Sequence, residues 1–187
     1  MPKLFIDTHS EKVLIAIVCD DKTYKKEATS NRSHSEVVVP LLDEILKESS
    51  IDIKDIKEII VVNGPGSFTG VRIGVTIAKT LAYSLSIPIK TITSLEMFGV
   101  SSTCEFDLVT IADSKGIYSA RYEDGKYSEF IYQRKVDYEE YVKKNEYKVL
   151  EGEIVNLDKV LAYVENEEHV NPHKVNPIYI KEIDALK

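Results

Sequence analysis

Residues 63–72 read NGPGSFTGVR and are the stretch of the chain whose composition most suggests chemistry. A continuous apolar run precedes them at residues 59–62, and a helical pattern follows them. A glycine-rich turn between a strand and a helix start presents unpaired backbone N–H groups and a partial positive charge, which suit an anion such as phosphate. The stretch is therefore a phosphate cradle, a catalytic loop or only a tight corner.

The spacing of this stretch fits no common phosphate-binding or nucleophile motif. A P-loop needs Gly-x-x-x-x-Gly-Lys-Ser/Thr, but the residue five after Gly64 is Thr69, and Gly70 is followed by a valine. A dinucleotide-binding fingerprint that begins at Gly64 would need a small residue at Thr69. The Gly-x-Ser-x-Gly elbow of hydrolases fails because Gly70 comes one residue too late after Ser67. The remaining interpretation is a tight turn in which Ser67 or Thr69 caps the helix.

Two aspartates, each at the end of a predicted strand, give a second candidate for chemistry. Asp7 is followed by Thr8 and His9, and Asp113 is followed by Ser114-Lys115-Gly116. Actin-like phosphotransferases have an Asp-x-Gly turn at this place in each half, where glycine lets the backbone approach phosphate. His9 stands where glycine is wanted, and its ring would crowd a phosphate. We therefore do not expect unaided ATP hydrolysis.

The histidines predict no metal site. His169 and His173 are four residues apart, but Pro172 between them removes the helix that this spacing requires. His34 lies between Ser33 and Ser35 at a predicted helix start, where we expect a polar cap or a partner contact and not a general base.

The elements that position these residues begin with three short strands at residues 4–8, 13–19 and 23–29, with a turn at 20–22. A helix capped by Ser33 or Ser35 follows and runs to about residue 49, and residues 59–62 predict a strand that is buried on both faces. The apolar residues of this helix recur at spacings of three and four: Val38, Leu41, Leu42, Ile45 and Leu46.

The helical pattern at residues 71–85 has one stripe with almost no side-chain volume, made of Gly70, Gly74, Ala78 and Ala82. Large apolar side chains crowd its other faces, so we expect a helix that is buried nearly all round. Two interpretations remain open. The helix is sandwiched inside its own domain, or the small stripe admits a helix of another subunit at close approach.

The second half of the chain repeats the opening pattern. A strand at 88–93 and a short helix at 94–100 lead to predicted strands at 108–112, 117–122 and 127–132, with a turn at 123–126. Two meanders, each with an aspartate near the end of its first strand, indicate a duplicated unit. Helices follow at 138–143 and 157–164, and we place the subdomain boundary between residues 101 and 102.

The composition is that of an ordinary globular protein: 187 residues, 43% hydrophobic, with a formal net charge of −7. This charge argues against gripping a nucleic-acid backbone unaided, because such binding needs lysines and arginines to displace counterions. The first apolar run stops at Asp7, too early for a secretory segment. With unpaired Cys19 and Cys104 far apart, we expect a protein of the cytoplasm and not of the membrane.

Residues 63–74 and 78–82 together resemble the signature of the TsaB (YeaZ) family. The resemblance covers residues 3 to about 132, and near the end Lys181 stands where the family's closing motif usually has arginine. The second half is shorter than is typical, and residues 113–115 depart from the common Asp-Ala-Arg. Further agreement comes from Asp7-Thr8, His34-Ser35-Glu36, Pro40-Leu41-Leu42, Ile87-Pro88, Thr93-Ser94-Leu95-Glu96, Ile111-Ala112-Asp113 and Tyr118.

The resemblance implies an actin-like, Hsp70-like ATPase fold (ASKHA, ribonuclease H-like) of the α/β class, with two related subdomains, 1–101 and a reduced 102–187. It also implies a non-catalytic subunit without a cofactor of its own. The paralogous TsaD enzyme has a His-x-x-x-His metal motif where this chain has Ser94 and Phe98, which cannot hold a metal. The former nucleotide-site positions would then be vestigial: Asp7, Thr8, His9 and Asp113.

The partners that the resemblance implies are the TsaD catalytic subunit, the TsaE ATPase, a second copy of the chain when alone, and tRNA only through the complex. The family relation favours the small stripe as a partner contact, so that Gly74→Leu or Ala78→Arg would leave a folded protein without its partner. The alternatives are an actin-like ATP-binding phosphotransferase and a metallopeptidase-like enzyme. The expected interface comprises His34, Glu36, Val38, Leu41, Leu42, Ile45, Gly70, Arg72, Ile73, Gly74, Ile77, Ala78, Leu81 and Ala82.

Overall fold

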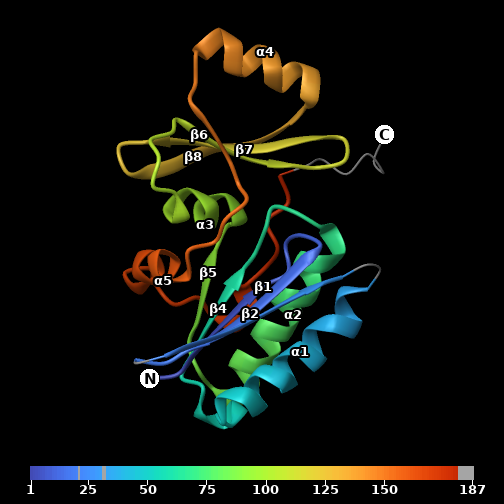
Figure 1. The fold of residues 1–187 in the computed structure, drawn as a ribbon, viewed down its shortest axis with the longest axis vertical. Coiled ribbons are helices and arrows are strands. Elements are labelled where there is room, and N and C mark those ends of the chain that lie inside the picture. Colours follow the sequence, from blue (N-terminus) through green and yellow to red (C-terminus); the bar gives the residue numbers. More distant parts are fainter. Residues whose placement is uncertain (21, 31–32, 181–187) are drawn as a thin grey trace. The chain divides into compact units, whose positions relative to one another are not determined.

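The computed structural model describes residues 1–20, 22–30 and 33–180 (Figure 1). Its internal contacts divide the chain into two compact units, one of Met1–Ile92 with Asn166–Pro177 and one of Thr93–Glu165 with residues 178–180. The units thus change at residue 92, and the chain crosses back at 166. The subdomain boundary after residue 101 stays a prediction. Asp21 of the predicted turn and Lys181 of the closing motif lie outside the described residues.

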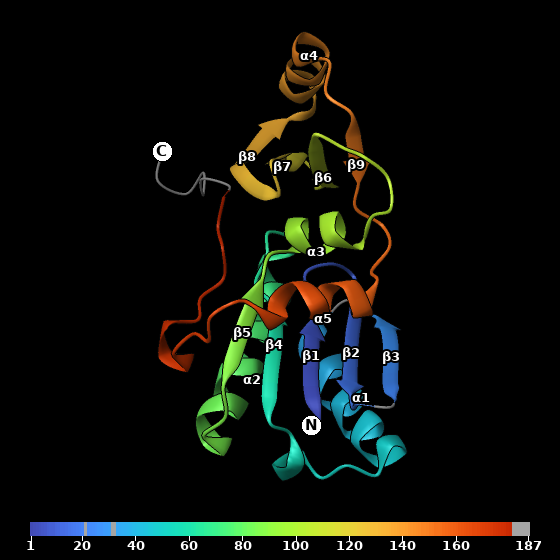
Figure 2. The ribbon, with the colours of Figure 1, turned by 90° about the vertical axis from the view of Figure 1, so that its left-hand side faces the viewer.

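The first unit is built on a five-stranded sheet in the order β3-β2-β1-β4-β5 (Figure 2). The predicted meander is confirmed, because β2 pairs antiparallel with both of its neighbours, whereas β4 runs parallel to β1, with Ile6 opposite Val61. Strand β5 is parallel to β4. The strands are β1 (Lys3–Asp7), β2 (Lys12–Val18), β3 (Thr23–Thr29), β4 (Glu58–Val62) and β5 (Ile89–Ile92).

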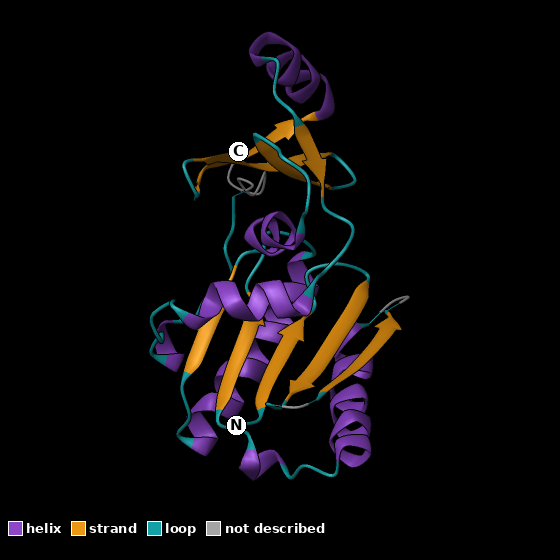
Figure 3. Ribbon diagram, turned by 60° about the vertical axis from the view of Figure 1, so that its left-hand side comes forward, coloured by secondary structure: helices purple, strands orange, loops and turns teal. Residues whose placement is uncertain are grey.

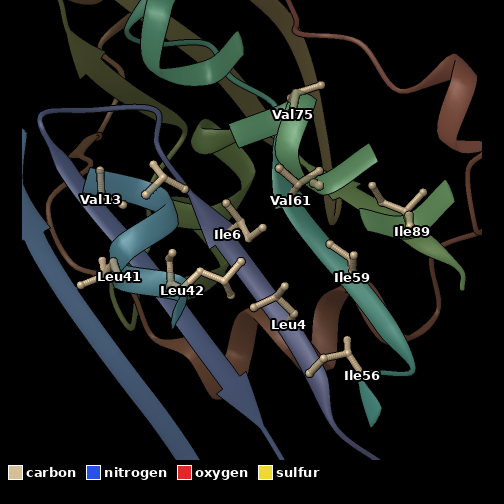
Figure 4. Packing of buried hydrophobic residues seen from close by; sticks show 14 of the residues in the cluster. Leu4, Ile6, Val13, Leu41, Leu42, Ile56, Ile59, Val61, Val75 and Ile89 are labelled. Carbon is tan, nitrogen blue, oxygen red and sulfur yellow. The ribbon is translucent and has the colours of Figure 1, made fainter. Parts of the chain in front are cut away.

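Two helices, α1 (His34–Ser49) and α2 (Phe68–Leu85), cover one face of this sheet, and a short 3-10 helix η1 (Ile53–Asp55) precedes β4. Their apolar sides meet alternate strand residues, among them Leu4, Ile6 and Ile59, in one continuous core (Figure 4). Burial of such side chains is the main stabilising contribution to the unit. No helix in the described part of the chain has both the length and the apolar character needed to cross a membrane.

The starts of the two helices differ from each other. Ser67 caps α2, since its Oγ accepts a hydrogen bond from Gly70 N at 3.2 Å, which confirms one of the two predicted caps. Ser33 precedes α1 without capping it, because its Oγ is hydrogen-bonded to Ser35 Oγ at 2.8 Å. The predicted side-chain cap of α1 is therefore wrong.

The segment Asn166–Pro177, with 3-10 helix η2 (Pro172–Lys174), returns to the first unit and lies along β5. Val170 N donates to Ile89 O at 2.9 Å, and Val175 is buried in the core. His169 reaches Glu58 at the start of β4, with 2.9 Å between Nε2 and Oε2. Because Glu58 also lies 3.2 Å from Lys3 Nζ and 3.7 Å from buried Lys90 Nζ, it anchors the returning segment.

This anchor predicts an acid-sensitive contribution to stability. Burial alone would raise the pKa of Glu58, but the hydrogen bonds from His169 and Lys3 and the charges of Lys3 and Lys90 outweigh it and hold the pKa below its usual value of 4.5. A carboxylate whose pKa is lower in the folded state than in the unfolded state contributes stability at pH values above the unfolded pKa. This contribution is lost as the pH falls through the folded pKa.

We therefore expect the free energy of unfolding of Glu58→Gln, measured with urea, to fall less steeply than that of the wild type between about pH 5 and pH 3. A lowered carboxyl pKa sets this window. At neutral pH the variant should be the less stable of the two, because the attraction between the Glu58 carboxylate and the buried Lys90 ammonium is lost. Glu153→Gln, which changes an exposed carboxylate, is the matched control. Parallel pH profiles for wild type and Glu58→Gln would contradict the prediction.

The second unit has a four-stranded sheet in the order β8-β7-β6-β9, which repeats the order of β3-β2-β1-β4 in the first unit. Figure 3 shows the strands of both sheets in orange. β7 is antiparallel to β6 and β8, and β9 is parallel to β6, so the predicted duplication is visible in the topology. Its elements are α3 (Ser94–Ser101), β6 (Leu108–Ala112), β7 (Gly116–Glu123), β8 (Lys126–Arg134), α4 (Lys135–Asn145), β9 (Val149–Glu151) and α5 (Leu157–Glu165).

Candidate functional site

The glycine loop packs directly against the turn between β1 and β2. Ser67 N donates to His9 O at 2.6 Å, and Thr8 Oγ1 donates to Gly70 O at 2.8 Å. A Cβ at Gly66 would lie 2.2 Å from His9 O, so only glycine allows this approach. The loop is thus a tight corner closed by the chain's own backbone.

The side chains of the turn are bonded within the chain. Asp7 Oδ1 accepts from His9 N at 3.0 Å and lies 2.7 Å from His9 Nδ1. Asp7, Thr8 and His9 are at most 5% exposed. These polar groups therefore stabilise the corner by mutual hydrogen bonds in a buried place, where such bonds contribute most. That the positions are vestiges of a nucleotide site stays a prediction.

The side chain of His34 is buried and makes a hydrogen bond within the chain. Its Nε2 donates to Ser10 O at 2.7 Å, which joins the start of α1 to the β1–β2 turn. A Cβ at Gly70 would come within 2.8 Å of this nitrogen, so the ring fills the space that the missing side chain leaves. The contact that the ring makes in this chain is internal, and a partner contact at His34 stays a prediction.

The small stripe of α2 faces the chain's own interior. A Cβ at Gly74 would lie 2.2 Å from Thr8 Oγ1, and Ala78 and Ala82 are buried in the core between helix and sheet. Within this chain the stripe therefore packs as the first interpretation expects, sandwiched in its own domain, and a contact of the stripe with a partner helix stays a prediction. Four α1 residues of the expected interface are buried in the same core of this chain: Val38, Leu41, Leu42 and Ile45.

Another part of α2 remains accessible. Ile73, Ile77 and Leu81 recur every four residues and are only partly buried, and we call them the outer row of α2. Beside them Arg72 is exposed, with its guanidinium carbon 3.8 Å from the centroid of the Phe68 ring, which is 48% exposed. The expectation of a helix buried all round is thus wrong on this side.

The start of α1 also has exposed residues. Glu36 is exposed, and Val39, which the sequence analysis did not single out, is 56% exposed. Val39 and Phe68 were missed because periodicity assigns an apolar residue to the core unless its place on the helix is known. Exposed large apolar side chains such as these are of the kind found at protein–protein contacts.

The remaining predicted site residues lie in the second unit or take part in other contacts. Asp113 directly follows β6, and its Oδ2 accepts a hydrogen bond from Tyr132 OH at 3.0 Å. Ser94 and Phe98 are buried within α3. His173 stacks edge-on against Tyr83, with ring centroids 4.8 Å apart, while His169 binds Glu58. Among residues 1–20, 22–30 and 33–180, no three or more His, Cys, Asp or Glu residues are grouped so that they could hold a metal ion.

Comparisons with known proteins agree with this arrangement. A family model described as "TsaD: tRNA N6-adenosine threonylcarbamoyltransferase" matches residues 23–171. A protein of Bacillus subtilis (strain 168), described as tRNA threonylcarbamoyladenosine biosynthesis protein TsaB, is 42% identical over 97 residues, 51% of this chain. The matched part is only 42% of that protein's length. A Haemophilus influenzae protein with the same description is 25% identical over 166 residues, 88% of this chain and 68% of its own.

The solved structure described as YeaZ from Pseudomonas aeruginosa superposes with a TM-score of 0.75 at 17% identity, over 95% of this chain and all of that one. The predicted fold class is thereby confirmed: an α/β fold of the actin-like ATPase (ASKHA) type with two related sheets, the second the smaller. The family model spans well over half of the chain, and the described relatives share one name. The chain therefore belongs to this family of threonylcarbamoyltransferase-like proteins, and within it to the TsaB (YeaZ) group.

Proposed function

We propose that this protein takes part in the synthesis of threonylcarbamoyladenosine on tRNA, as a non-catalytic subunit that pairs with the TsaD catalytic subunit. In this proposal it works in the cytoplasm, supports binding of the TsaE ATPase, meets tRNA only through the complex and needs no cofactor of its own. The descriptions of the B. subtilis and H. influenzae relatives support the pathway. When TsaD is absent, the same surface would hold a second copy of the chain.

The observation that carries the partner role is the outer row of α2. Its three aliphatic side chains already touch the core at one edge, so they are held in place before any partner arrives. An aromatic ring and an arginine stand beside them at Phe68 and Arg72, the residue types enriched in the centres of interfaces. A facing helix would pack onto such a row at an interaxial distance of about 8–10 Å.

The buried corner at the glycine loop supports a non-catalytic role. The turn that should approach a phosphate in an actin-like enzyme is bonded to its own loop through Thr8 and His9. An ATP-binding phosphotransferase would instead bind Mg-ATP as the isolated chain, which calorimetry detects directly. A metallopeptidase-like enzyme would carry stoichiometric metal after purification, which elemental analysis measures.

The partner surface is tested by Ile77→Arg. Because Ile77 is only partly buried, its replacement should leave the chain folded while placing a charge in the middle of the proposed contact. We expect co-purification with TsaD from the same cell to fall by at least about tenfold, as for a central interface residue. Ile154→Arg, the same replacement at a site that is 77% exposed in the second unit, is the matched control and should keep the complex.

Circular dichroism of each variant separates loss of the partner from loss of the fold. If folded Ile77→Arg still forms the complex at wild-type mass, the contact surface lies elsewhere. If wild-type protein and TsaD do not associate at all, the proposed role itself fails.

A further inference from the structure

The second unit contains a cavity of about 700 Å³, whose lining includes no residue of the glycine loop or of the outer row of α2. It lies among the end of α3, the loop that follows it, the β7–β8 hairpin and α5, and this volume is in the range of roughly 300–1,000 Å³ found for small-molecule sites. Its lining includes Gly99, Ser102, Glu105, Phe106, Tyr122, Tyr127, Lys159 and Tyr163.

A continuous series of aromatic rings forms much of the wall. Phe106 is stacked on Tyr122 with centroids 5.1 Å apart, Tyr122 is 4.8 Å from Tyr127, and the Tyr127 and Tyr163 rings meet edge to face at 6.4 Å. These four side chains come from three separate segments of the chain and are all partly exposed. They present ring faces and edges on which a further planar ring can stack.

The central ring of this wall is held firmly. A Cβ at Gly99 would lie 2.2 Å from Tyr127 OH, so α3 approaches this tyrosine as closely as a glycine permits. Burial raises the pKa of Tyr127, and the phenol therefore stays neutral at physiological pH. A rigid neutral ring is a platform for stacking that loses little conformational entropy on binding.

Two charged groups at the cavity can form hydrogen bonds with polar atoms at the edge of a ligand. Lys159 Nζ donates to Ser102 O at 2.6 Å, which fixes the ammonium at the wall, and an ammonium has three N–H donors in all. Glu105 is an exposed carboxylate on the rim, 3.4 Å from Lys148 Nζ, and can accept hydrogen bonds. A ligand that fits both has hydrogen-bond acceptors and an amino group on one planar ring system.

We propose that this cavity binds a purine nucleoside, with the base stacked among Phe106, Tyr122 and Tyr163 and its polar edge toward Lys159 and Glu105. Stacking of a base on an aromatic side chain strengthens binding whichever base it is, because every base has a π-face. The proposal does not depend on the contact with TsaD, because the site lies wholly within the second unit.

The charges favour a nucleoside over a nucleotide or an RNA chain. Within the described residues, the lining holds one ammonium and one carboxylate, which cancel. A phosphate would need a bidentate arginine or several donors, and a nucleic-acid backbone would need basic residues that a chain of net charge −7 does not concentrate. A neutral ribose meets neither obstacle.

Isothermal titration of the full chain with adenosine tests the site. We expect saturable binding by the wild type, about tenfold weaker binding by Tyr122→Leu, and weaker binding by Lys159→Met. Tyr163→Leu, on a helix surface, is a second variant should Tyr122→Leu fail to fold. Tyr83→Leu removes an exposed ring of the first unit and should bind as the wild type does.

Several results would overturn the proposal. They are the absence of saturable heat with millimolar adenosine, and wild-type affinity in both folded tyrosine variants. Tighter binding of adenosine monophosphate would indicate a nucleotide site, and tighter binding of N-acetyl-tyrosinamide would indicate that an aromatic side chain of a protein fills the cavity.

Discussion

Gly74→Leu should abolish stable folding, with an expected loss of about 4 kcal/mol or more in the free energy of unfolding. A Cβ at this position would lie 2.2 Å from Thr8 Oγ1, which itself donates to Gly70 O, so the clash falls on a buried, hydrogen-bonded side chain with little room to move. Three further carbon atoms would then have to enter the same packed interior. The measurement is urea unfolding, or the soluble yield if the variant does not fold.

The matched control is Ile77→Leu, one turn further along α2 on its accessible side, which should unfold within about 1 kcal/mol of the wild type. A folded and stable Gly74→Leu that has merely lost its partner would restore the small stripe as a contact surface. The distinction matters because the same glycine predicts opposite phenotypes under the two interpretations.

Asp7→Ala should destabilise the protein by about 2–3 kcal/mol, because it removes one acceptor that serves two buried donors, His9 N and His9 Nδ1. Asp7→Asn keeps an acceptor oxygen at the same place and should therefore lose clearly less stability than Asp7→Ala. Urea unfolding of the three proteins gives the order. A structural role requires that the amide substitute largely restores stability.

The same pair of variants separates structure from catalysis. If Asp7 handled a nucleotide, Asn would remove its charge and with it Mg-ATP binding, whatever its effect on stability. A wild type that binds Mg-ATP and an Asp7→Asn variant that does not would contradict the closed corner. Equal stability of Asp7→Ala and wild type would show that the turn contributes nothing to the fold.

The sequence predicted the elements of the first unit well because their signals are local. Alternating and continuous apolar runs predicted each end of β1 to β4 to within one residue. Ser67 was recognisable as a cap because it directly precedes a helical pattern. By contrast, β9 has only three residues and no alternation, so pairing with β6 defines it and its own residues do not.

The proposed partner surface was harder to predict because periodicity shows that a helix has distinct faces without showing what each face meets. Gly70 and Gly74 were identified as a small stripe, but whether a stripe admits a foreign helix or the chain's own Thr8 depends on the distant β1–β2 turn. The aromatic wall of the second unit joins Phe106, Tyr122 and Tyr163 from three segments, and no spacing in the sequence relates them.

The returning segment also has a consequence for the order of events on the ribosome. The chain leaves the first unit at Ile92, builds the strands of the second, and only then supplies Asn166–Pro177, whose Val170 pairs with Ile89. The segment that pairs with the outer edge of β5 is therefore synthesised only after the more than seventy residues between Ile92 and Asn166. The four strands of the second sheet are all synthesised before Asn166–Pro177, so this sheet can form during translation before the first unit is closed.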